Sequence, residues 1–120
     1  MAVSERTPQA RVLREQLREE AIAAPHVVDL EVVIALRRLL HRGELSLAAA
    51  ERAIGTLQRL RIERHTHPEL LPRIWDLREN VTPYDAAYVA LAEALGVPLL
   101  TADARLADAP GIRCEVELLT

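Results

Sequence analysis

The segment from Thr82 to Leu106 constrains the fold more than any other part of the sequence, because it carries strong start and stop signals. Thr82 is a good N-cap, Pro83 suits the first helical position, and Asp85 takes the third position of a capping box. A helix that ends at Gly96 is therefore expected. Apolar residues with helical spacing predict its buried face: Tyr84, Ala87, Tyr88, Leu91, Ala92 and Leu95.

The residues after this helix, 97–101, predict a strand buried on both faces, because they are few, apolar and followed by polar residues. A helix that returns to a strand through a tight turn is half of a parallel α/β unit. Asp103 comes just after the strand. Open α/β sheets place their chemistry at the carboxyl ends of the strands, so Asp103 is a candidate site residue.

The rest of the chain alternates strands with helices, which predicts one α/β domain over residues 1–120, with 1–7 disordered. Asp29 and Ser46 are expected N-caps, Gly43 a helix stop, and Thr66 to Glu69 a capping box. Further helices are expected at 7–20, 31–42, 46–60 and 66–80, and further strands at 23–28, 61–65 and 112–118. The predicted architecture is a three-layer domain whose short, mostly parallel sheet is flanked by helices.

Helical spacing also predicts which side chains of these helices face the core. They are Val32, Val33, Leu36, Leu39, Leu40, Leu47, Ala50, Ala53, Ile54, Leu57, Leu70, Leu71, Ile74 and Leu77. The core must be aliphatic, because the chain has only three aromatic residues, namely Trp75, Tyr84 and Tyr88.

Composition excludes several classes of protein. The formal net charge of −3 argues against binding nucleic acid through bulk positive charge. The single cysteine, Cys114, excludes an internal disulfide or a cysteine-rich zinc site and is interpreted as a small apolar residue in a strand. No segment has the length of a membrane span or the pattern of a signal peptide, so a cytoplasmic protein is expected.

Three acidic residues, Glu31, Asp85 and Asp103, each lie near the start of an element that follows a loop at one end of the predicted sheet. Carboxylates gathered in one crevice repel one another, and a hard divalent cation such as Mg²⁺ or Mn²⁺ removes that repulsion. Such a cation can activate a water molecule and stabilise a phosphodiester during hydrolysis. The alternative for each acid is structural: Glu31 and Asp85 suit a helix N-terminus, and Asp103 could be an ordinary N-cap.

Three blocks of sequence resemble the conserved blocks of PIN-domain ribonucleases, and the closest resemblance is to the VapC toxins of toxin–antitoxin pairs. The blocks are 25–32 (PHVVDLEV), 82–92 (TPYDAAYVALA) and 100–106 (LTADARL). The resemblance implies a Mg²⁺-dependent endoribonuclease in which Glu31, Asp85 and Asp103 are the catalytic, metal-binding acids. The Thr82 hydroxyl would contact the metal-binding residues rather than the metal ion itself. It also implies an RNA substrate, a cognate antitoxin and a homodimer.

The sequence departs from the family at its N-terminus. The family begins with an apolar strand that ends in a metal-site aspartate, whereas the first aspartate here is Asp29. That strand lies in the middle of the family's sheet. We therefore expect a PIN-like domain without its N-terminal central strand, with the strands near Val28 and His65 separated from those near Leu99 and Val116. We also expect the nucleotide sequence upstream of Met1 to encode, in frame, an apolar run ending in aspartate.

Other signals leave alternatives open. Arg37, Arg38 and Arg42 could contact RNA phosphates, or form a solvated helix face. Trp75 is interpreted as a packing or dimer residue rather than a base-stacking one. For the whole chain, the alternatives to an active nuclease are a truncated, catalytically inactive module that retains antitoxin or dimer binding, and an unrelated α/β domain whose acids are only caps.

Overall fold

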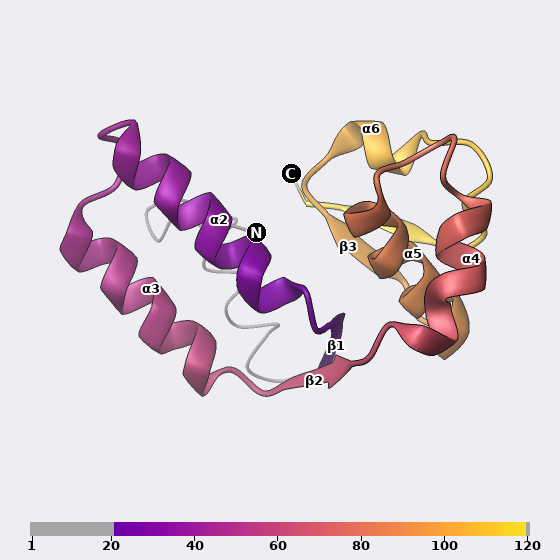
Figure 1. Cartoon of the computed structure of the whole chain (residues 1–120), viewed down its shortest axis with the longest axis horizontal. Helices are drawn as coiled ribbons and strands as arrows, with labels where there is room; N and C mark the ends of the chain where they lie inside the picture. Colours follow the sequence, from indigo (N-terminus) through magenta and orange to yellow (C-terminus); the bar gives the residue numbers. More distant parts are fainter. Residues whose placement is uncertain (1–20, 120) are drawn as a thin grey trace. The chain divides into compact units, whose positions relative to one another are not determined.

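The computed structural model describes residues 21–119, which divide into two compact units (Figure 1). Of these residues, 21–23 and 27–63 belong to the first unit, and 24–26 and 64–119 to the second. The predicted helix at 7–20 and the predicted disorder of 1–7 lie outside the described residues. The single domain expected from the sequence stays a prediction.

The first unit is built around a hairpin of two helices, α2 (Val28–His41) and α3 (Leu47–Arg59). The N-cap of α3 is Ser46, whose hydroxyl accepts a hydrogen bond from the Ala49 amide at 3.1 Å, as predicted. Gly43 follows α2 with a φ of 71°, a left-handed conformation that suits glycine. The prediction of Asp29 as a cap is wrong: α2 starts at Val28, so Asp29 lies inside the first turn.

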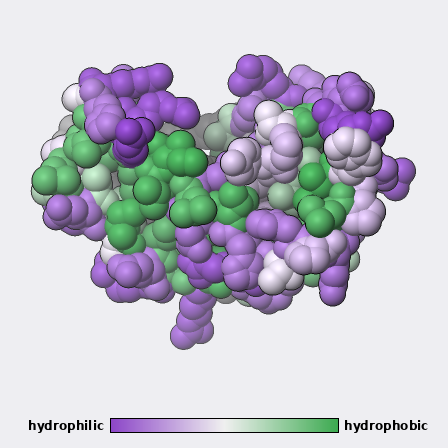
Figure 2. All heavy atoms as spheres, viewed as in Figure 1, coloured by the Kyte–Doolittle hydropathy of each residue, from purple (hydrophilic) through white to green (hydrophobic). Residues whose placement is uncertain are grey.

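The hairpin buries fewer apolar residues than the sequence predicts. Leu36 and Ala50 are buried, but Val33 is exposed and Leu47 is 60% exposed. Figure 2 shows hydrophobic residues on the visible surface of α2 and α3. Helical spacing predicts which side chains share a face, whereas burial requires a neighbouring element to cover that face.

The four described strands pair in two separate two-stranded sheets. In one, β1 (Ile22–Pro25) pairs with β2 (Ile62–His65). In the other, β3 (Leu99–Thr101) runs parallel to β4 (Val116–Leu118), with Leu99 opposite Val116. These are the two groups of strands that the sequence predicts. The first strand is shorter than predicted, because Val28 already belongs to α2.

The second unit contains the 3₁₀ helix η1 (Pro68–Leu70) and the helices α4 (Leu71–Asp76), α5 (Pro83–Leu95) and α6 (Ala104–Ala107). The single helix predicted at 66–80 is wrong, since η1 and α4 divide the segment and α4 stops at Asp76. The predicted cap at Thr66 is also wrong, because the N-cap position of η1 is His67. Pro68 and Pro72 stand near the two helix starts, where a missing amide hydrogen is tolerated.

Helix α5 has the predicted bounds and is the most deeply buried helix of the described chain. The Thr82 hydroxyl accepts the Asp85 amide at 3.2 Å, and Gly96 ends the helix with a φ of 66°. Six residues of α5 are buried: Ala86, Ala87, Val89, Ala90, Leu91 and Ala92. The predicted burial of Tyr84 and Leu95 is wrong, because these residues lie at the two exposed ends of α5.

The core of the second unit lies between α5, the end of α4, β3 and α6. Its buried cluster consists of Leu77, Ala86, Val89, Ala92, Leu99 and Leu106. In β3, Leu99 is buried but Leu100 is exposed, so the prediction of burial on both faces is wrong. No helix within residues 21–119 combines the length and apolar character needed to cross a membrane.

Candidate active site

Asp85 is held at the start of α5 by the cap of that helix. Its amide donates to the Thr82 hydroxyl, and its side chain is half-buried. Ala86, the next residue, is completely buried in the core of the second unit. The Asp85 carboxylate is therefore anchored at a helix N-terminus, where the helix dipole favours negative charge.

Asp103 lies just after the carboxyl end of β3, as predicted, and is the N-cap of α6. Its amide donates to the Thr101 hydroxyl at 3.0 Å, and its Oδ1 accepts the Arg105 amide at 2.9 Å. Thr101 is in turn tied to β4, since its carbonyl accepts the Leu119 amide at 2.7 Å. Sequence reasoning missed this role of Thr101, although the Thr-x-Asp spacing is a recognisable signal for such a turn.

The elements that carry these two aspartates share one core. Ala86 follows Asp85, Leu106 lies one turn after Asp103, and both are members of the buried cluster. Glu31 lies in the first unit, in the first turn of α2, where its amide donates to the Val27 carbonyl at 3.0 Å. Within residues 21–119 no three His, Cys, Asp or Glu side chains are grouped to hold a metal ion, so a site shared by all three acids stays a prediction.

The chemistry of these side chains fits a hard divalent cation. All three donors are carboxylates, the ligand type that Mg²⁺ and Mn²⁺ prefer. In the described part of the chain, Oδ1 of Asp103 accepts hydrogen bonds from Arg105, while Oδ2 of Asp103 and the Asp85 carboxylate have no hydrogen bond. These oxygens are therefore available as ligands.

The three candidate RNA contacts on α2 are exposed: Arg38 lies in the last turn, Arg42 is the C-cap, and Arg37 lies just before the last turn. The C-terminal end of a helix favours positive charge, so the positions of Arg38 and Arg42 also have a purely structural explanation. Both interpretations of these arginines therefore stay open.

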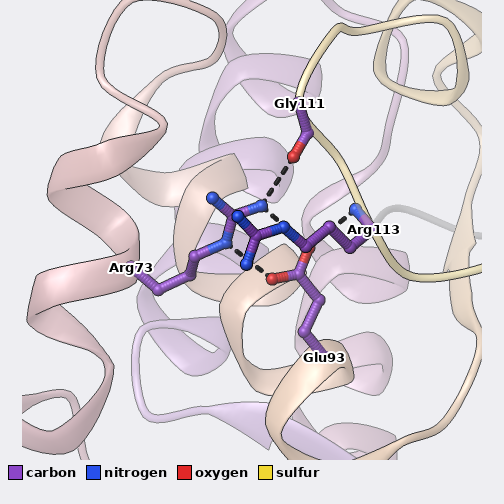
Figure 3. A network of polar contacts seen from close by, with 4 residues as sticks. All are labelled: Arg73, Glu93, Gly111 and Arg113. Carbon is purple, nitrogen blue, oxygen red and sulfur yellow. Dashed lines mark hydrogen bonds and ion pairs between the residues drawn. The ribbon is translucent and has the colours of Figure 1, made fainter.

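A polar network that the sequence does not predict joins α4, α5 and the chain before β4 (Figure 3). The Glu93 carboxylate accepts Arg73 Nε at 2.7 Å, Arg73 Nη2 at 3.2 Å and the Arg113 amide at 2.8 Å. Arg73 Nη2 also donates to the Gly111 carbonyl at 2.6 Å. Arg73 and Glu93 lie 20 residues apart in sequence, and no local pattern marks them as partners.

This network perturbs the titration of its members. The hydrogen bond from Arg73 lowers the pKa of Glu93, and the same bond raises the pKa of Arg73. Burial raises the pKa of the Cys114 thiol, and the Glu93 charge adds to that effect. The placement of Cys114 in a strand is wrong, because β4 begins at Val116.

The comparisons with known proteins agree with this fold. The sequence profile of the PIN domain matches residues 1–112, and the chain belongs to the PIN-domain family. It is 51% identical over 111 residues to Ribonuclease VapC1 of Mycobacterium tuberculosis, covering 92% of this chain and 84% of that protein. It is 42% identical over 106 residues to VapC ribonuclease Mb0985 of Mycobacterium bovis, covering 88% of this chain and 84% of that protein. It is 37% identical over 113 residues to Ribonuclease VapC12 of Mycobacterium tuberculosis, covering 94% of this chain and 88% of that protein.

Proposed function

We propose that this protein is the ribonuclease toxin of a toxin–antitoxin pair and hydrolyses RNA phosphodiester bonds with Mg²⁺ or Mn²⁺. The observation that carries the proposal is its identity of 51% over 92% of the chain to a protein named as a ribonuclease. The placement of Asp85 and Asp103 on elements that share one core supports it.

In this proposal Glu31, Asp85 and Asp103 hold the metal ion, and Thr82 supports Asp85. The metal supplies Lewis-acid chemistry when bound, lowering the pKa of a water molecule and stabilising charge on the phosphate. The cap formed by Thr82 fixes the direction of the first turn of α5. The hydrogen bond from the Asp103 amide to the Thr101 hydroxyl fixes the turn after β3 in the same way.

Several partners follow from the family and are part of the proposal. We expect a cytoplasmic homodimer that binds a cognate antitoxin, and we expect Arg37, Arg38 and Arg42 to contact the phosphates of the RNA. Light scattering on the purified chain, alone and mixed with the antitoxin, measures both assemblies.

A second candidate function is a catalytically inactive module that retains antitoxin or dimer binding. The strand pairing favours it: the predicted site takes Glu31 from the helix after β1 and Asp103 from the turn after β3, and β1 and β3 belong to separate sheets.

Incubation of the purified protein with end-labelled RNA and Mg²⁺ separates the two functions. Asp85→Asn and Asp103→Asn are each expected to lower the cleavage rate at least about a hundredfold. Asp108→Asn is the matched control, because it removes an exposed carboxylate at the other end of α6. Chelation should abolish cleavage, and added Mg²⁺ or Mn²⁺ should restore it. The metal-dependent mechanism would be refuted if cleavage survived chelation, or if it survived both Asp85→Asn and Asp103→Asn. Intact antitoxin binding without any cleavage would establish the inactive module.

A further inference from the structure

The guanidinium group of Arg105 lies beside a candidate site carboxylate. Arg105 Nε donates to Oδ1 of Asp103 at 3.4 Å, and the Arg105 amide donates to the same oxygen at 2.9 Å. The Arg105 side chain is 93% exposed, so this ion pair lies in water and contributes little to stability. The fold of the second unit therefore gives no reason for a cation at this position.

Arg105 keeps most of its hydrogen-bond donors for another partner. An arginine side chain has five N–H donors in one plane, and within residues 21–119 only Nε of Arg105 is bonded. The Asp103 carboxylate is divided in a matching way, because Oδ1 accepts from Arg105 while Oδ2 accepts no hydrogen bond from the same part of the chain. Oδ2 can therefore bind a cation while the Nη groups of Arg105 bind an anion next to it.

The other arginines of the segment 66–119 lie elsewhere. Arg73 is bonded to a carboxylate of α5, and Arg78 lies against an aromatic ring of α4. Arg113 precedes β4, whereas Asp103 follows β3. Because β3 and β4 are parallel, these two positions lie at opposite edges of the sheet. Arg105 is therefore the arginine of this segment that the structure places at a candidate site acid.

The charges of the candidate site call for such a cation. One divalent metal ion does not neutralise three carboxylates, and an RNA phosphate brings a further negative charge. We infer that Arg105 binds the RNA phosphate that lies beside Asp103, through its Nη groups, while its Nε stays on Oδ1 of Asp103. A guanidinium can hold a phosphate by two parallel N–H bonds, which fix the orientation of the phosphate. The inference rests on the proposed function and adds a substrate-binding residue to it.

The test compares Arg105→Gln with Arg113→Gln in the full chain. Both substitutions are made together with Asp85→Asn, which keeps the RNA intact, and the chain with Asp85→Asn alone is the reference. Each removes one exposed arginine charge, but only Arg105 lies beside a candidate site acid. Arg105→Gln retains the amide bond to Oδ1 of Asp103, so the turn after β3 should keep its shape. The anisotropy of a labelled RNA oligonucleotide gives the affinity at several salt concentrations.

Arg105→Gln should weaken RNA binding about tenfold at low salt, as expected for a charged hydrogen bond at a partly exposed site. The slope of log affinity against log salt concentration should become shallower by about 0.7–0.9, the change for one lost phosphate contact. Arg113→Gln should leave both values close to those of the reference. Arg105→Lys should keep the slope of the reference but not its full affinity, because an ammonium group cannot make two parallel bonds.

A second measurement locates the phosphate. Short oligonucleotides are prepared in which one phosphate at a time is replaced by an uncharged methylphosphonate. At one position, the loss of affinity seen with the reference should disappear in Arg105→Gln, because the two changes remove the same contact. An equal loss in both proteins at every position would show that Arg105 contacts no phosphate.

The inference is overturned if Arg105→Gln has the affinity and salt dependence of Arg113→Gln, or if the reference binds no RNA. Failure of the nuclease proposal gives a different result. A phosphate contact that depends on Arg105, in a protein whose unsubstituted chain cleaves no RNA, refutes only the catalytic function. Cleavage by the unsubstituted chain, with RNA binding unchanged in Arg105→Gln, refutes only the role of Arg105.

Discussion

Replacing Glu93 by alanine removes the carboxylate that ties α4, α5 and the chain before β4 together (Figure 3). The Arg73 and Glu93 side chains are 20% and 14% exposed, so water screens the pair only partly. Hydrogen bonds to charged groups contribute about 1.5–3 kcal/mol each, whereas fully exposed ion pairs contribute about 0–1 kcal/mol. Within residues 21–119, the substitution also leaves the Gly111 carbonyl as the only hydrogen-bond acceptor of the Arg73 side chain. We expect Glu93→Ala to lower the free energy of unfolding by about 2–4 kcal/mol.

The effect of this substitution should depend on pH in a defined direction. Because the hydrogen bond from Arg73 lowers the pKa of Glu93, the folded state binds the Glu93 proton less tightly than the unfolded state does. The stabilisation is therefore fully present above the ordinary glutamate pKa. It is lost as the pH falls through the lowered pKa of the folded state. The difference in stability between the parent and Glu93→Ala should shrink over that acidic range.

Urea unfolding followed by circular dichroism measures these free energies, with the slope m checking that the unfolded state is unchanged. Glu93→Gln should lose about half as much stability, because it keeps a neutral acceptor in place of a charged one. Glu117→Ala is the matched control: it removes the same charge from an exposed position on β4, where a change within about 0.5 kcal/mol is expected. If Glu93→Ala cost no more than Glu117→Ala, the pair would behave as a surface ion pair and the reasoning would be refuted.

Two further predictions concern the second unit, each measured by urea unfolding. Leu77→Ala should lower the free energy of unfolding by about 2–5 kcal/mol, because Leu77 is buried in the core cluster. Leu71→Ala should lower it far less, because Leu71 is 54% exposed, and equal losses would contradict the assigned core. Gly111→Ala should cost more than Gly96→Ala. Both glycines have positive φ, but only at Gly111 would a Cβ also lie close to another side chain, 2.9 Å from Nδ2 of Asn80, which would have to move away; the reverse order would contradict this geometry.

The positions of the candidate site residues along the chain follow from local signals. Thr82, Pro83 and Gly96 set the bounds of α5, and Asp103 lies just after β3 as predicted. These features depend on hydrogen bonds and φ angles within a few residues, so a short window of sequence contains the necessary information. Local signals gave a wrong prediction for residues 66–80, where the expected single helix is divided in two. Each of the two shorter helices has a proline near its start, and the second ends early, at Asp76.

The sequence by itself determined the α/β class and the start and stop of α5, and its family resemblance added the grouping of the strands into two pairs. Only the tertiary structure decided that Arg73 pairs with Glu93, that Leu100 is exposed, and that Trp75 and Tyr84 face outward. Helical or strand spacing places a side chain on a face. Whether that face meets another element or water depends on residues far away in the chain, and burial is a property of that non-local packing.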